Sequence, residues 1–264
     1  MKGCSKMFNR ILWINPLSEL AALDKPVAEF INSIKRSNTQ VDVISLKRGP
    51  MHLQYYYYRA LILSDCINQI KRAEKEGYNA VIIGCFCDPG LQEAREITDR
   101  IVVTAPAESS MLIASSLGRR FSIIVASDKS IPKMYENVVN YGFVNRLASF
   151  ESVDLEVLDF QNNKTETIRR IQKAAERAIH EKLAEVIILG CTMEFGFYKE
   201  LQKELKIPVI DAIVAPIKYA EFMIELRNKF GWGHSKICSY KSPPISEIKE
   251  WKLCDQYPEM KELW

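Results

Sequence analysis

The sequence predicts an α/β fold made of two pseudo-symmetric three-layer domains with mainly parallel sheets. Two observations carry this prediction: short apolar runs alternate with longer segments of helical spacing, and part of this pattern occurs twice. Short runs rich in Val and Ile are typical of parallel strands that are buried on both faces. The strand candidates are residues 11–14, 41–46, 81–83, 121–125, 186–189 and 208–210.

The longer segments between these runs have the apolar spacing of amphipathic helices. Strands that alternate with helices predict βαβ units and therefore parallel sheets. A chain of 264 residues can form one large domain or two of about 100 residues or more. The helix candidates are residues 25–36, 60–76, 91–97, 107–117, 131–140, 165–182 and 197–206.

An internal repeat favours two domains. The segment VIIGCFCDPG begins at Val81 and the segment VIILGCTMEFG begins at Val186, and each is an apolar strand that ends in Gly-Cys. Each is followed by a helix candidate and then by a short strand that leads to a proline, IVVTAP in the first copy and PVIDAIVAP in the second. A repeat of this length predicts two similar α/β halves, each of which presents one cysteine to a cleft between them.

The repeat also sets the predicted domain boundaries. The first half comprises residues 1–105 and, because the chain is expected to return, about 212–230, and the second half comprises residues 106–211. The C-terminal extension, residues 231–264, differs in texture and holds three of the four tryptophans. We expect this extension to be a cap or a partner-binding segment.

Composition excludes several function classes. Lys and Arg total 36 against 33 Asp and Glu, and the net charge of +3 is spread along the chain, so no nucleic-acid partner is expected. No apolar run approaches the roughly 18 residues of a membrane span, and the start does not read as a secretory signal. We therefore expect a cytoplasmic protein without a membrane partner, whose seven cysteines are reduced.

Cys85 and Cys191 are the candidate catalytic residues. Each follows a predicted strand, and ligands of open α/β sheets bind beyond the carboxyl ends of the strands. A helix N-terminus at that place lowers the pKa of a thiol toward neutrality, so each cysteine could serve as a base. The preceding Gly84 and Gly190 would let the backbone approach a ligand closely.

The spacing Cys85-x-Cys87 leaves metal or redox chemistry open as an alternative. A zinc site needs four ligands, and no second cysteine pair lies near in the sequence. The three histidines are scattered, so no metal site is predicted.

The stretch GCFCDPGLQEAREI, residues 84–97, resembles the first-cysteine motif of hydantoin and allantoin racemases, a branch of the aspartate/glutamate/hydantoin racemase superfamily. The segment LGCTMEFG from Leu189 resembles the second-cysteine motif of the superfamily, and the resemblance extends over about residues 10–225. The chain departs from the family pattern at Leu17, where Asn is common, and at Met193 and Glu194, where hydantoin racemases often have small residues. A substrate different from both named compounds is compatible with these departures.

The resemblance implies a cofactor-independent racemase that acts on a hydantoin-like small molecule, a 5-substituted hydantoin or allantoin, by two-cysteine proton transfer. It also implies a homo-oligomer. The alternatives are an amino-acid racemase, another isomerase or decarboxylase on the same scaffold, and a non-catalytic small-molecule binding protein whose tail covers the cleft. The expected substrate-binding residues beside Cys85 and Cys191 are Asn15, Phe86, Cys87, Ser109 and Thr192.

Overall fold

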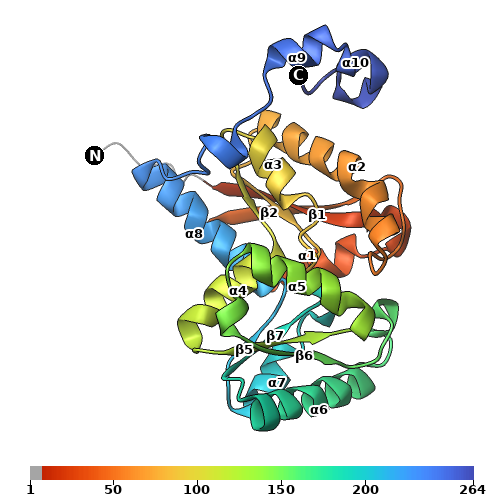
Figure 1. The fold of residues 1–264 in the computed structure, drawn as a ribbon, viewed down its shortest axis with the longest axis vertical. Coiled ribbons are helices and arrows are strands. Elements are labelled where there is room, and N and C mark those ends of the chain that lie inside the picture. The colour runs from red at the N-terminus through yellow and green to blue at the C-terminus, as the bar shows by residue number, and fades with distance from the viewer. Residues whose placement is uncertain (1–7) are drawn as a thin grey trace.

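Two four-stranded parallel sheets form the framework of the protein, whose computed structural model describes residues 8–264. The strand orders are β2-β1-β3-β4 and β6-β5-β7-β8, so the second sheet repeats the topology of the first. The predicted two-domain α/β fold is confirmed (Figure 1). The strands are β1 (Asn9–Ser18), β2 (Thr39–Leu46), β3 (Ala80–Ile83), β4 (Val102–Thr104), β5 (Phe121–Val125), β6 (Leu147–Ser152), β7 (Val186–Leu189) and β8 (Val209–Ile210).

Helices cover both faces of each sheet, as parallel βαβ connections require. Residues 1–7, which the predicted first half includes, lie outside the described part of the chain. Among residues 8–264, no helix has the length and apolar character that crossing a membrane would require. The α-helices are α1 (Asp24–Ile34), α2 (Tyr56–Lys75), α3 (Leu91–Ile97), α4 (Pro106–Leu117), α5 (Ile131–Asn140), α6 (Lys164–Lys182), α7 (Tyr198–Leu205), α8 (Val214–Phe230), α9 (Ile245–Glu250) and α10 (Leu253–Gln256).

The two halves exchange helices. Helix α4 follows β4 of the first sheet but packs against β5, β7 and β8 of the second. Helix α8 follows β8 of the second sheet but packs against β1, β3 and β4 of the first, where Ile217 and Ile224 join a buried cluster with Ile11 and Trp13. Helices α4 and α8 also contact each other. Each sheet is therefore covered by a helix that begins in the other half.

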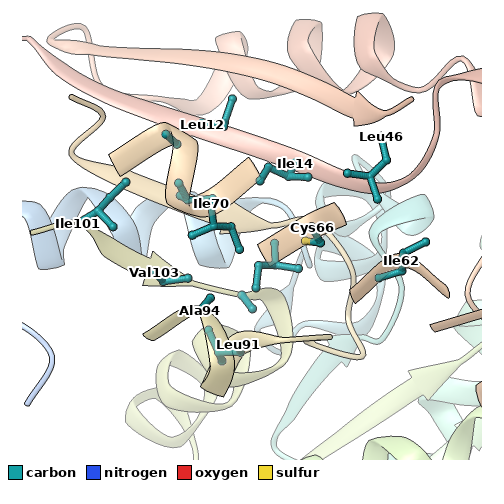
Figure 2. Close-up of a cluster of buried hydrophobic side chains, with 14 of the residues drawn as sticks. Leu12, Ile14, Leu46, Ile62, Cys66, Ile70, Leu91, Ala94, Ile101 and Val103 are labelled. Atoms are coloured by element: carbon teal, nitrogen blue, oxygen red, sulfur yellow. The ribbon is translucent and has the colours of Figure 1, made fainter. Parts of the chain in front are cut away.

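The core of the first half lies on both faces of β1, because successive side chains of a strand point to opposite faces. Leu12 and Ile14 pack on one face with Ile70 of α2 and Val103 of β4, as Figure 2 shows. Ile11 and Trp13 pack on the other face against α1 and α8. A strand buried on both faces explains why the run that begins at Ile11 is apolar throughout.

Strand β6 and helix α8 were not predicted within the two halves, and helices α9 and α10 were not predicted in the C-terminal extension. Strand β6 was not among the strand candidates, because it is an edge strand with mostly half-buried residues and has no continuous apolar run. Helix α8 was also not among the helix candidates. Its Pro216 lies in the first helical turn, where the missing N–H would have no partner within the helix.

The C-terminal extension packs on the first half, at the end farther from the second half (Figure 1). His234 Nε2 accepts a hydrogen bond from the backbone N–H of Val103 on the edge strand β4, at 3.1 Å. Lys236 Nζ donates to the carbonyl oxygens of Arg95 and Thr98 at the end of α3, each at 3.0 Å. The extension thus covers an open sheet edge, and it does not line the pocket described below.

Candidate active site

A pocket lies between the two halves at the carboxyl ends of the strands, and both Cys85 and Cys191 line it. Its volume of about 70 Å³ is several times the roughly 10–15 Å³ that one ordered water needs, so a small molecule fits. Among the described residues, no Asp, Glu, Lys or Arg lines the pocket. The lining is Leu17, Leu23, Met51, His52, Leu53, Gln54, Gly84, Cys85, Phe86, Cys87, Ala126, Ser130, Met134, Val157, Leu158, Gly190, Cys191, Thr192 and Met193.

Matching backbone hydrogen bonds hold the two cysteine loops. Gly84 N–H donates to the Ile14 carbonyl and Gly190 N–H donates to the Ile124 carbonyl, each at 2.8 Å. These bonds extend the pairing of β3 with β1 and of β7 with β5 by one step. The chain then turns in the same way in both halves, since the N–H of the residue three positions after each cysteine donates to the cysteine carbonyl.

The two glycines serve the close approach of neighbouring strands. A Cβ atom on Gly84 would lie 2.5 Å from the Trp13 ring, and one on Gly190 would lie 2.3 Å from the Ile124 carbonyl oxygen. Real Cβ atoms do not come this close to other heavy atoms. The space that each glycine leaves is therefore filled by protein, and the prediction that it admits a ligand is wrong.

Asp88 ties the Cys85 loop to helix α4. Its carboxylate oxygens accept hydrogen bonds from the backbone N–H groups of Ala107 and Glu108, both at 2.9 Å, and from the Tyr141 hydroxyl at 3.0 Å. The first N–H groups of a helix have no partner within the helix, so Asp88 acts as their cap.

Glu194 has a related place after the second cysteine. Its Oε2 accepts from the backbone N–H of Cys191 at 3.0 Å, while its other oxygen is buried without a hydrogen-bond partner in the described structure. Burial raises the pKa of Glu194 well above its usual value.

The pKa values of the Cys85 and Cys191 thiols differ from the sequence prediction. The Cys87 side chain, together with burial, raises the pKa of Cys85, and burial raises the pKa of Cys191. The predicted lowering of both values is wrong. The Cys87 side chain and burial at Cys85, and burial at Cys191, outweigh the backbone N–H groups of Cys87 and Met193, which do favour the thiolates. In addition, α3 begins only at Leu91, so Cys85 does not lie at a helix N-terminus.

The other predicted site residues divide into two groups. Phe86, Cys87 and Thr192 line the pocket, and the Thr192 hydroxyl donates to the Gly84 carbonyl of the other half at 3.3 Å. Asn15 and Ser109 do not line it.

Both of these residues are buried elsewhere. The Asn15 amide accepts a hydrogen bond from Trp13 Nε1 at 2.7 Å and donates one to Asp24 at 2.8 Å, so its hydrogen bonds go to protein groups. Ser109 is buried in α4, and its hydroxyl has no hydrogen-bond partner among residues 8–264.

Three polar lining residues were missed from the sequence. His52 and Gln54 come from the loop after β2, and Ser130 follows β5. Loops after β2 and β5 also lie at the carboxyl ends of parallel strands, so the same rule that selected the cysteines points to them. The described residues contain no group of three or more His, Cys, Asp or Glu side chains that is placed to hold a metal ion.

The fold and the pocket define a two-domain α/β protein in which one cysteine from each half lines a shared small-molecule site. Residues 11–220 match the family model described as Asp/Glu/Hydantoin racemase. The chain belongs to this family, and its enzyme class is that of the racemases, which are isomerases.

Similar proteins indicate the branch of the racemase family to which the chain belongs. A hydantoin racemase from Pseudomonas sp. (strain NS671) is 38% identical over 239 residues, which cover 90% of this chain and 93% of that protein. A hydantoin racemase from Paenarthrobacter aurescens is 35% identical, with coverage of 89% and 97%. The structure of an allantoin racemase from Klebsiella pneumoniae superposes with a TM-score of 0.82 at 26% identity and covers 89% of this chain and 94% of its own. These similarities place the chain among racemases of the hydantoin and allantoin branch.

Proposed function

We propose that the protein interconverts the enantiomers of a 5-substituted hydantoin with an apolar side chain by proton transfer through Cys85 and Cys191. The observation that carries this proposal is that the two cysteines occupy matching positions of the two halves and line one pocket. Racemisation removes a proton from one face of a carbon and returns a proton to the opposite face, so it needs two acid/base groups that flank the substrate.

In one direction the Cys85 thiolate takes the proton from C5 of the ring and the Cys191 thiol donates a proton to the other face. The roles exchange in the reverse direction. Proton removal leaves an enolate, which fixed hydrogen-bond donors stabilise. The backbone N–H groups of Phe86 and Thr192 are candidates, because neither donates a hydrogen bond within residues 8–264. This mechanism uses no cofactor.

The lining of the pocket supports the choice of substrate. Leu17, Leu23, Met51 and Leu158 surround it with apolar surface, whereas His52, Gln54 and Thr192 offer a few polar atoms. A neutral ring with an apolar substituent suits such a site, since the ring can use the polar groups and the substituent the apolar ones. A free amino acid such as aspartate would bury charges without a charged partner in the lining.

The first experiment follows enantiopure substrates by proton NMR in D₂O and by circular dichroism, with no-enzyme controls for spontaneous racemisation. The panel contains 5-isobutylhydantoin, 5-benzylhydantoin, allantoin, aspartate and glutamate. We expect enzyme-dependent loss of the C5 proton and of the optical signal for the first two compounds. Preferential turnover of allantoin or of an amino acid would overturn the proposed substrate class.

The second experiment tests the two thiols. Cys85→Ser and Cys191→Ser should each slow inversion by about 100-fold or more, since a general acid or base typically contributes about 10²–10⁴. Each variant should still exchange the C5 proton of one enantiomer, and the two variants should prefer opposite enantiomers. Cys238→Ser, which changes an exposed thiol, is the matched control and should leave the rate unchanged. Two-fold or smaller losses in the first two variants would exclude the mechanism.

A further inference from the structure

Arg59 is a buried cation without a carboxylate partner. Its side chain comes from α2 and only 7% of the residue is exposed, yet no described Asp or Glu forms an ion pair with it. The guanidinium lies over the Tyr56 ring at 4.2 Å and donates to the Leu53 carbonyl at 3.4 Å, both of which are uncharged groups. A buried charge is costly unless an opposite charge accompanies it.

The third contact of Arg59 offers that opposite charge. Its Nη1 donates to Cys87 Sγ at 3.5 Å, and a thiolate is the charged form of this acceptor. Cys87 lines the site pocket and also a neighbouring cavity of about 230 Å³, whose lining includes Arg59 and Lys133 of α5. Cys87 therefore lies between the cations of that cavity and the two thiols of the pocket.

We propose that Cys87 holds the resting negative charge of the site as a thiolate paired with Arg59, and that it accepts the proton of Cys85 so that Cys85 can act as the base. Cys85 and Cys87 lie two positions apart in one loop and both line the site pocket, which brings the two thiols close enough to exchange this proton. The inference rests on the two-cysteine function proposed above. Cys87 and Arg59 act through Cys85 and are positioning residues.

The transfer balances without an oxidant or reductant. The S–H bond of Cys85 breaks, an S–H bond forms on Cys87, and the negative charge moves from Cys87 to Cys85. Cys85 then takes the substrate proton, and Cys191 supplies the proton that completes inversion. After product release, the proton held by Cys87 returns to Cys191 through water in the pocket, which restores the resting state.

The groups around Cys87 favour its thiolate form, as the proposed resting state requires. The Cys85 side chain, Arg59 and Lys133 together outweigh the opposing effect of burial and lower the pKa of Cys87 to about 7. Lys133 is shared with Glu136, at 3.1 Å, so Arg59 is the cation committed to Cys87. Cys191 and His52 are the remaining titratable groups that line the pocket with Cys85 and Cys87, and Asp88, Glu93 and Tyr141 line the neighbouring cavity with Cys87. Burial raises the pKa of Asp88 to about 8, so a titration that belongs to Asp88 would remain in Cys87→Ser, whereas the thiolate titration would disappear.

The test compares Cys87→Ser, Arg59→Met and Arg59→Lys with the wild type by the pH dependence of kcat/KM and by the ultraviolet absorbance of thiolates. The wild type should show a rising limb and a thiolate titration near pH 7. Cys87→Ser should lose that titration and move the limb up by at least one pH unit, with about a tenfold lower rate at pH 7 for each unit and recovery at high pH. Arg59→Met should move the midpoint of the thiolate titration to higher pH, and Arg59→Lys should return it to the wild-type value.

Arg72→Met, a cation change on the same helix, is the matched control and should leave both curves unchanged. An unchanged limb and titration in Cys87→Ser would overturn the proposal. Should that variant fail to fold, alkylation of the wild type by iodoacetamide at a series of pH values, followed at Cys87 by mass spectrometry, decides the question. A midpoint near pH 7 supports the pairing of Cys87 with Arg59. A midpoint at or above the free thiol value of about 8.5 refutes it. Because neither titration needs substrate, the failure of the proposed function remains distinguishable.

Discussion

Gly190→Ala should destabilise the second half by distorting the contact between β7 and β5. The new Cβ would lie 2.3 Å from the Ile124 carbonyl oxygen and 2.9 Å from Ile123 Cγ2, against the 3.0 Å that real Cβ atoms respect. The neighbour at 2.3 Å is backbone, so a strand must move by at least the 0.7 Å difference. The same movement weakens the hydrogen bond from Gly190 N–H to Ile124, which is 2.8 Å long.

The magnitude follows from three contributions. Overpacking costs about 1–3 kcal/mol and a weakened backbone hydrogen bond about 1 kcal/mol, while the lower entropy of the unfolded chain returns about 0.4–1 kcal/mol. The net loss is about 1–3.6 kcal/mol, which lowers Tm by about 2–14 °C at 2–4 °C per kcal/mol for chains of this size class. Thermal unfolding followed by far-ultraviolet circular dichroism measures this shift.

Gly233→Ala provides the control for Gly190→Ala. A Cβ atom on Gly233 has no heavy atom within 4 Å and its φ is not positive, so this variant should melt like the wild type. A Tm for Gly190→Ala within 2 °C of the Gly233→Ala value would refute the steric reasoning.

Two further predictions concern the fold around the site. Asp88→Ala removes the cap of α4 and should lower the free energy of unfolding, measured in urea, by about 2–4 kcal/mol. The control Asp128→Ala, at an exposed position, should lower it by less than about 0.5 kcal/mol. Equal losses in the two variants would contradict the capping role. Burial lowers the pKa of His234 to about 4 from 6.5, so its stabilising effect is complete above pH 6.5 and is lost as the pH falls toward 4. The stability difference between wild type and His234→Gln should shrink by roughly 3 kcal/mol over that interval, and a constant difference would exclude the effect.

The sequence predicted the central strands and most helices because their local patterns agree with their tertiary positions. Residues 91–97 and 131–140 were predicted with the bounds that α3 and α5 have. Strand β6 was not predicted because an edge strand with half-buried residues lacks an apolar run. Its residues form a strand through pairing with β5. Helix α8 escaped because its residues are buried by a sheet that is distant in sequence.

The site shows the same limit. The repeat predicted Cys85 and Cys191, and the structure brings them to one pocket. The ionisation of the thiols could not be predicted, because burial and the contact between Arg59 and Cys87, which are 28 positions apart, arise only in the folded chain. Asn15 was assigned to the substrate because its bonds to Trp13 and Asp24 leave no sign in the sequence.

The exchange of α4 and α8 explains how two separate halves hold two thiols at a fixed separation. Phe86 and Cys87 follow a strand of the first sheet, yet they pack in a core cluster with Met111 of α4 and Phe121 of the second sheet. Asp88 joins the same loop to the start of α4. The first cysteine loop is therefore anchored in the core of the second half, where Cys191 originates. Because interiors are close-packed, a substitution that shifts α4 must also shift Cys85 relative to Cys191, so such changes should lower kcat even when they lie outside the pocket.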